Sequence, residues 1–197
     1  MFKNNQFKIF QIGFNKCGTR SIHHFFQKNG IKSIHYDNGR LAKTILIRNY
    51  NNKLLLDNKY NKYTVFTDME NISSYMFPIY IPQLFFKKLY YQYPNSKFIL
   101  NIRNKQKWLK SRCAHINGNY LKIISNKLKK TEEEVVLHWS NEWDIHINNV
   151  KLFFTKKPGK LLIFDIENDD IQKLINFFRN DFNLDDQHYI HKGKSII

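Results

Sequence analysis

Short apolar runs alternate along the chain with longer stretches in which apolar residues recur at helical spacing. The runs with the length and composition of buried strands are residues 7–12, 33–36, 64–67, 97–102 and 161–165. Strands that alternate with helices are typical of α/β proteins with a parallel sheet. The pattern therefore predicts one α/β domain of three layers, with a central parallel sheet of about five strands.

Helices are expected between these strands, at residues 21–28, after Gly39, at 84–93, from Lys105, at 131–154 and at 170–178. Thr131 and Glu134 have the spacing of a capping box, which supports a helix start there. Trp139 and Trp143, four residues apart, are expected in the core. The pattern leaves 116–130 unassigned. Because no repeat and no linker rich in Pro, Gly or Ser interrupts the chain, residues 1–197 are expected to form a single domain.

Right-handed crossovers place the carboxyl ends of all strands of a parallel sheet at one edge, and ligands bind at that edge in open sheets of this kind. The residues that follow the predicted strands are therefore the first candidates for a functional site. They are 13–21, 35–37, 68–70, those from 103 onward, and 165–167.

Composition narrows the class of protein. With 197 residues and 42% hydrophobic residues the chain can bury a full core. No apolar run approaches the length of a membrane span, and the first residues lack the apolar segment of an export signal, so we expect a cytoplasmic protein. Cys17 and Cys113 are the only cysteines and are expected to be free thiols.

The net charge of +16 indicates an anionic partner, such as nucleic acid, a phosphorylated cofactor, an acidic polysaccharide or an anionic lipid. The lysines are spread over every segment and form no basic arm or tail. The charge therefore suggests a class of partner and no particular function.

The segment from Gly13 to Ser21 carries the strongest signal for chemistry. It has two glycines five residues apart between a predicted strand and a predicted helix, the arrangement of a phosphate-binding loop. It is not a Walker A motif, because no lysine follows Gly18 directly. Thr19 and Ser21 would add hydroxyl donors, and Lys16 and Arg20 would add positive charge. The alternative is a tight strand-to-helix turn with an ordinary N-cap.

These residues resemble the sulfotransferases that use 3′-phosphoadenosine 5′-phosphosulfate (PAPS), and Lys16-Cys17-Gly18-Thr19-Arg20-Ser21 is most similar to the heparan-type branch. That family has an Arg at the end of a strand and a Ser eight residues later, as Arg103 and Ser111 are here. The tail around Lys192, Gly193 and Lys194 resembles the family's late basic loop, although it lacks the cysteines that heparan-type enzymes pair there.

The resemblance implies roles for these residues. Lys16 would stabilise charge on the leaving phosphate, and the loop residues Lys16, Cys17, Gly18, Thr19, Arg20 and Ser21 would bind the 5′-phosphosulfate of PAPS. Arg103, Ser111, Lys192, Gly193 and Lys194 would bind the 3′-phosphate, and the product would be 3′-phosphoadenosine 5′-phosphate. The sequence contains no metal-ligand motif, and no metal is expected.

An acceptor hydroxyl also needs a general base. Asp68 is favoured because it follows the third predicted strand, where cytosolic sulfotransferases have their catalytic histidine. Asp37 and His35, after the second strand, come next, and Glu70 follows them. For each of these residues a structural role as an N-cap or a strand-end hydrogen bonder is an equal alternative.

The predicted function is transfer of a sulfuryl group from PAPS to a small-molecule or saccharide acceptor, with a saccharide hydroxyl as the first choice and other alcohols, amines or peptide tyrosines open. One alternative is a nucleotide or small-molecule kinase, against which stand the missing lysine after Gly18 and the lack of a convincing magnesium ligand. Another is a non-enzymatic nucleic-acid binder, although no recognised binding motif is present. An inactive protein with the same fold is the third alternative.

Overall fold

The computed structural model describes residues 2–74 and 77–190. Five strands form one sheet in the order β2-β3-β1-β6-β7, and every pair of neighbours is parallel. The strands are β1 (Ile9–Gln11), β2 (Ser33–His35), β3 (Val65–Thr67), β6 (Lys97–Ile102) and β7 (Leu161–Asp165). The predicted five-stranded parallel sheet is therefore confirmed, with β1 at its centre.

Helices connect these strands, and a two-stranded antiparallel hairpin, β4 (Glu70–Asn71) with β5 (Ile79–Tyr80), follows β3. The α-helices are α1 (Thr19–Lys28), α2 (Arg40–Tyr50), α3 (Asn58–Asn61), α4 (Ile81–Gln92), α5 (Lys105–Cys113), α6 (Asn119–Leu128), α7 (Glu132–Phe154) and α8 (Ile171–Phe178). Two short 3-10 helices, η1 (Asp37–Gly39) and η2 (Asp186–His188), complete the described chain.

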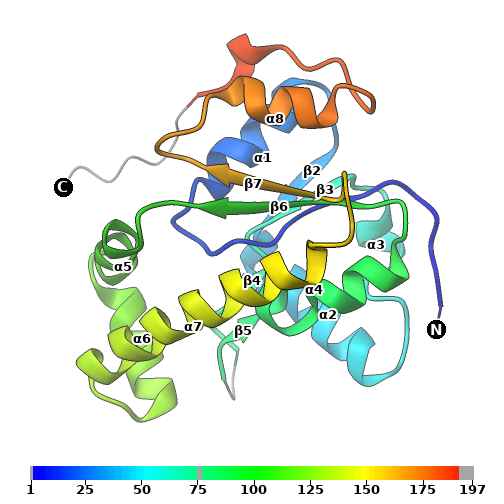
Figure 1. Ribbon diagram of the computed structural model, residues 1–197. Helices are drawn as coiled ribbons and strands as arrows, with labels where there is room; N and C mark the ends of the chain where they lie inside the picture. Colours follow the sequence, from blue (N-terminus) through cyan, green and yellow to red (C-terminus); the bar gives the residue numbers. More distant parts are fainter. Residues whose placement is uncertain (1, 75–76, 191–197) are drawn as a thin grey trace.

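The molecule has three layers (Figure 1). Helices α1 and α8 cover one face of the sheet, and α2, α4, α5, α6 and α7 lie on the other side. Successive residues of a strand point to opposite faces. Thus Ile9 and Ile99 pack in the core under α1 and α8, whereas Phe10 and Phe98 pack in the larger core on the opposite face. Because both faces are covered, most residues of the strands are apolar, and this is why the sequence pattern revealed them.

The long helix α7 begins as expected. Thr131 caps the backbone N–H of Glu134, and the Glu134 side chain accepts the backbone N–H of Thr131. Trp139 and Trp143 on this helix are buried, and the ring of Trp143 lies 4.5 Å from that of Trp108. Both the capping box and the core position of the two tryptophans are confirmed.

Some elements differ from the expectation. Helix α4 starts at Ile81 rather than Leu84, because Pro82 occupies the first turn, where its missing N–H costs nothing. Helix α6 forms within the unassigned segment, and α3 and the β4–β5 hairpin were not predicted. Strands of two residues and a helix of four are too short to show a hydrophobic period.

Within the described residues, no helix has the length and apolar character needed to cross a membrane.

Candidate active site

The loop between β1 and α1 is held in place by the side chain of Asn101 on the neighbouring strand β6. This fully buried amide accepts the backbone N–H of Gly13 at 3.1 Å and donates to the carbonyls of Cys17 at 2.6 Å and Phe14 at 3.3 Å. A Cβ at Gly13 would lie 2.2 Å from the backbone oxygen of Asn101, so only glycine fits there. Asn101 was not among the predicted site residues, although a lone amide inside the run Phe98 to Ile102 was a visible signal.

Lys16 lies in this loop, half-buried and with a left-handed backbone at φ 61°. Burial lowers the pKa of its ammonium, the nearby charges of Arg20 and Arg103 lower it further, and the carboxylate of Asp68 opposes them. These electrostatic effects place Lys16 among two other cations and one carboxyl group.

The predicted loop residues Cys17 and Thr19 are buried, Gly18 is half-buried with φ 74°, and Arg20 is exposed on the first turn of α1. Ser21, on the same turn, is buried.

Arg103 lies at the carboxyl end of β6 and contacts the loop directly. Its Nη1 donates to the Lys16 carbonyl at 3.1 Å, and its Nη2 donates to Glu167 Oε1 at 2.9 Å. Its Nε is buried and has no hydrogen-bond partner among the described residues. Ser111, the predicted companion of Arg103, is buried in α5. The structure therefore places Arg103 against the loop, and its role at the 3′-phosphate stays a prediction.

His35 and Asp68 meet at the ends of β2 and β3. His35 Nε2 lies 3.5 Å from Asp68 Oδ2, and His35 Nδ1 is 3.0 Å from the Thr67 hydroxyl. Burial lowers the pKa of His35 to about 3, helped by the charges of His23 and Arg20. Burial and the Glu70 carboxylate raise the pKa of Asp68 well above its ordinary value, against the cations Arg112, Arg20 and Lys16. Asp68, the favoured base candidate, and His35, one of the two that came next, thus form one pair near Lys16.

The backbone is strained at the same edge of the sheet. Lys16 lies in the loop after β1, Tyr36 follows β2 and Asp68 follows β3, with φ values of 61°, 58° and 54°. Residues other than glycine rarely adopt this left-handed backbone conformation, and those that do are concentrated at functional sites. The strain therefore coincides with the candidate site.

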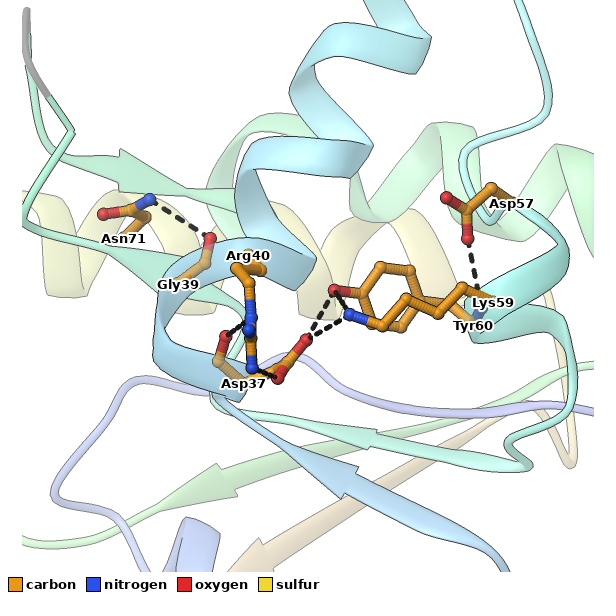
Figure 2. Close-up of polar contacts among 7 residues, drawn as sticks. All are labelled: Asp37, Gly39, Arg40, Asp57, Lys59, Tyr60 and Asn71. Atoms are coloured by element: carbon orange, nitrogen blue, oxygen red, sulfur yellow. Dashed lines mark hydrogen bonds and ion pairs between the residues drawn. The ribbon is translucent and has the colours of Figure 1, made fainter.

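Asp37, the other predicted base, has different partners (Figure 2). Its carboxylate accepts hydrogen bonds from Arg40 Nη2 at 2.7 Å, the Tyr60 hydroxyl at 2.6 Å and Lys59 Nζ at 3.1 Å. Burial alone would raise the pKa of Asp37, but these three hydrogen bonds outweigh it and lower the pKa to about 2. A carboxylate so well paired is a weak base, and its contacts join η1 to α3.

A buried polar network links the loop to the hairpin after β3. Glu70 accepts from Asn15 Nδ2 at 3.0 Å and from the Tyr120 hydroxyl, which also receives Arg112 Nη2 at 3.1 Å. Arg112 is fully buried, with its guanidinium carbon 4.5 Å from the Trp139 ring centroid. Burial raises the pKa of Glu70, against the positive charge of Arg112. The sequence placed Glu70 last among the base candidates and did not suggest Arg112.

His115, after α5, was also not among the site residues that the sequence predicted. Burial lowers the pKa of its imidazole to about 4, and the charges of Lys16 and Arg20 contribute to this shift. His115 therefore lies within electrostatic reach of the loop.

The predicted tail residues Lys192, Gly193 and Lys194 lie outside the described residues. Nowhere among the described residues are three His, Cys, Asp or Glu side chains arranged to hold a metal ion.

The chemistry of this edge is that of an anion site with a proton acceptor beside it. Cations from the ends of β1 and β6 and from α1 surround a glycine-containing loop at a helix N-terminus, which suits phosphate or sulfate oxygens. The carboxyl group of Asp68, whose raised pKa favours proton uptake, lies beside them.

Comparison with known proteins agrees with this description. A family model described as "Sulfotransferase domain" matches residues 8–152. Among solved structures, the chain is similar to the crystal structure of a sulfotransferase from Alicyclobacillus acidocaldarius, with a TM-score of 0.57 and 15% sequence identity over 92% of this chain and 85% of the other. No match was found among curated proteins. Because the family match extends over well more than half of the chain, the chain belongs to the sulfotransferase family.

Proposed function

We propose that the protein transfers a sulfuryl group from PAPS to an acceptor hydroxyl. The observation that carries this proposal is the contact between the phosphate loop and Arg103, whose Nη1 donates to the Lys16 carbonyl at 3.1 Å. This contact joins the two motifs through which the sequence resembles PAPS-dependent enzymes. The family match covering residues 8–152 supports the same reading.

The described residues fit such a donor. The glycine at position 13 leaves room for a tight loop, and Gly18 caps α1 without a side chain. The buried Nε of Arg103 is a donor without a protein partner among the described residues, which is what a subsite for an anionic group requires. The loop from Lys16 to Ser21 would hold the 5′-phosphosulfate, and Arg103 and Ser111 the 3′-phosphate. Binding of the same 3′-phosphate by Lys192, Gly193 and Lys194 remains a prediction.

When bound, PAPS supplies a transferable sulfuryl group on a phosphate leaving group. Lys16 would place its ammonium where negative charge develops on the bridging oxygen, an interaction of the kind that contributes most to such reactions. Asp68 would accept the proton of the acceptor hydroxyl, and burial makes it a stronger base than an ordinary aspartate. His35, 3.5 Å from Asp68 Oδ2, would hold that carboxyl group in position. Asp37 is not part of the proposal, because its three hydrogen bonds occupy its carboxylate.

We propose a saccharide hydroxyl as the acceptor. The net charge of +16 would attract an acidic glycan. A screen of neutral and acidic saccharides, small alcohols and tyrosine peptides with labelled PAPS would identify the acceptor class.

The first experiment is calorimetric titration of the purified protein with 3′-phosphoadenosine 5′-phosphate, and separately with ATP and magnesium. We expect micromolar binding of the bisphosphate without metal and no binding of ATP. Binding of ATP alone would favour the kinase alternative. If neither ligand bound, the phosphate-loop assignment would be wrong and nucleic acid would be the next ligand to test.

Two variants then separate catalysis from binding. Lys16→Ala should abolish sulfuryl transfer, because it removes the charge beside the leaving group, whereas Arg103→Ala should chiefly weaken binding of the bisphosphate. Turnover with labelled PAPS and calorimetry on the same preparations measure the two effects. Loss of turnover without weaker binding in Arg103→Ala would contradict the assignment of Arg103 to the 3′-phosphate.

A further inference from the structure

Glu167, just beyond the carboxyl end of β7, forms an ion pair with Arg103 and accepts a backbone hydrogen bond at the start of α5. Its Oε1 accepts from Arg103 Nη2 at 2.9 Å and lies 3.5 Å from Lys107 Nζ. Its Oε2 accepts the backbone N–H of Asn104, the N-cap residue of α5, at 3.0 Å. Burial alone would raise the pKa of Glu167, but the hydrogen bonds from Asn104 and Arg103 and the charge of Lys107 lower it.

The groups that hold Glu167 are those that proteins use for phosphate. A guanidinium, an ammonium and a backbone N–H at a helix N-terminus together bind anionic oxygens. Here all three are directed at a carboxylate of the chain itself. The side chains of Arg103 and Glu167 are only 18% and 19% exposed, so their attraction is less screened than that of a surface ion pair.

Arg103 therefore has little capacity left for a ligand in this arrangement. Nη1 contacts the Lys16 carbonyl and Nη2 contacts Glu167, and Nε remains without a partner among the described residues. An incoming phosphate must either share the guanidinium with Glu167 or displace it. A phosphate monoester carries a charge of about −1.5 to −2 at neutral pH, against −1 for a carboxylate, so it competes well for the same donors.

We propose that Glu167 is an internal competitor for the 3′-phosphate and sets the affinity and specificity of that subsite. It holds Arg103 until a ligand with a phosphate dianion at this place displaces it, and weaker anions do not displace it. Specificity through an opposing interaction of this kind is common in selective binding sites. The inference rests on the proposed function, because it takes Arg103 as a ligand of the 3′-phosphate.

The test compares wild-type protein with Glu167→Gln by calorimetric titration at low ionic strength. The ligands are 3′-phosphoadenosine 5′-phosphate and adenosine 5′-phosphate, which lacks the 3′-phosphate. Asp144→Asn is the matched control, because it removes a carboxylate that pairs with Lys105 of the same helix α5 at 2.6 Å. Circular dichroism melts check that each variant is folded.

We expect Glu167→Gln to bind the bisphosphate about tenfold more tightly, which corresponds to about 1.4 kcal/mol. Binding of adenosine 5′-phosphate should change less than about twofold, and Asp144→Asn should leave both affinities near the wild-type values. Glu167→Asp, whose shorter side chain withdraws the carboxylate from Arg103, should give a smaller gain and serves as a second variant if Glu167→Gln does not fold.

The other outcomes are distinguishable. Weaker or unchanged binding of the bisphosphate by folded Glu167→Gln would overturn the inference, since Glu167 would then orient Arg103 or act only in folding. An equal gain for both nucleotides would also overturn it, because the effect would be that of general charge. If wild-type protein bound no bisphosphate at all, the proposed function would fail and the inference would fall with it.

Discussion

At the scale of single residues, the Asp68 carboxyl group experiences opposing influences. Burial and the neighbouring Glu70 carboxylate disfavour its ionised form, whereas Arg112, Arg20 and Lys16 favour it, and the net effect is a raised pKa. A general base works best when its pKa approaches the working pH, so the environment that makes Asp68 costly to ionise also makes it useful. Asp37 is the contrasting case, since its hydrogen bonds favour ionisation and remove its basicity.

The first prediction concerns Asp68→Asn. Because an amide cannot accept the proton of the acceptor hydroxyl, we expect turnover to fall by about 10²–10⁴ while affinity for the bisphosphate changes little. The wild-type rate should rise with pH through a pKa above the usual aspartate value of about 3.9, since only the ionised carboxylate is a base. That rising limb should be absent in the variant.

Steady-state rates across pH, with Asp144→Asn as the control, measure these effects. An unchanged pH profile in Asp68→Asn would assign the base to another residue, with His35 the next candidate because of its contact with Asp68.

At the scale of elements, β6 organises the loop that follows β1. One buried amide, Asn101, connects the two segments by accepting one hydrogen bond and donating two, and the absence of a side chain at Gly13 lets the segments approach. The loop is thus shaped by a strand that lies almost ninety residues further along the chain, as the sequence separation of 88 between Gly13 and Asn101 shows.

The second prediction is that Asn101→Ala weakens bisphosphate binding at least about tenfold and lowers stability by about 2–4 kcal/mol. Removing the amide leaves a buried N–H and two carbonyls without partners, each at a cost of about 1–3 kcal/mol before relaxation. Asn71→Ala is the matched control, since Asn71 is also buried and donates to the carbonyl of Gly39, outside the loop. Calorimetry and denaturant unfolding should show destabilisation in both variants but loss of binding in Asn101→Ala alone; retained binding there would mean that the loop keeps its shape without this anchor.

At the scale of the whole molecule, buried histidines make stability depend on pH. His146 lies in the core with its Nε2 2.7 Å from the Ile12 carbonyl, and burial lowers its pKa to about 4. An unfolded histidine titrates near 6.5, so between these values the unfolded chain binds a proton that the folded chain does not. The contribution of the neutral His146 side chain to folding stability is therefore fully present above about pH 6.5 and is lost as the pH falls towards 4.

The third prediction follows from this linkage. The melting temperature should fall between pH 7.5 and 5, by an amount on the order of 5 °C for the His146 contribution, and His146→Gln should show a smaller pH dependence than wild type. His138→Gln, a change at a partly exposed histidine of the same helix, is the control. The same pH dependence in wild type and His146→Gln would show that other groups dominate the response.

The sequence by itself determined the α/β class, the five strands and the strand-loop-helix segment that contains Lys16. These features are local, because strands covered on both faces are mostly apolar and an anion-binding loop between a strand and a helix has its glycines and cations in one short segment. For the same reason the residues around Lys16 and Arg103 could be compared with a known family, and that family is confirmed, whereas the roles of the two residues stay predictions.

Only the tertiary structure decided which of these residues meet. The order β2-β3-β1-β6-β7 makes β2 and β3 neighbours and β6 and β7 neighbours, and so pairs His35 with Asp68 and Arg103 with Glu167. The hydrogen bond from Tyr60 to Asp37 likewise depends on where α3 packs. Alternating strands and helices are compatible with several strand orders, and a pKa depends on burial and on charges that are distant in sequence. Partners and proton affinities therefore came from packing, whereas the elements themselves came from local pattern.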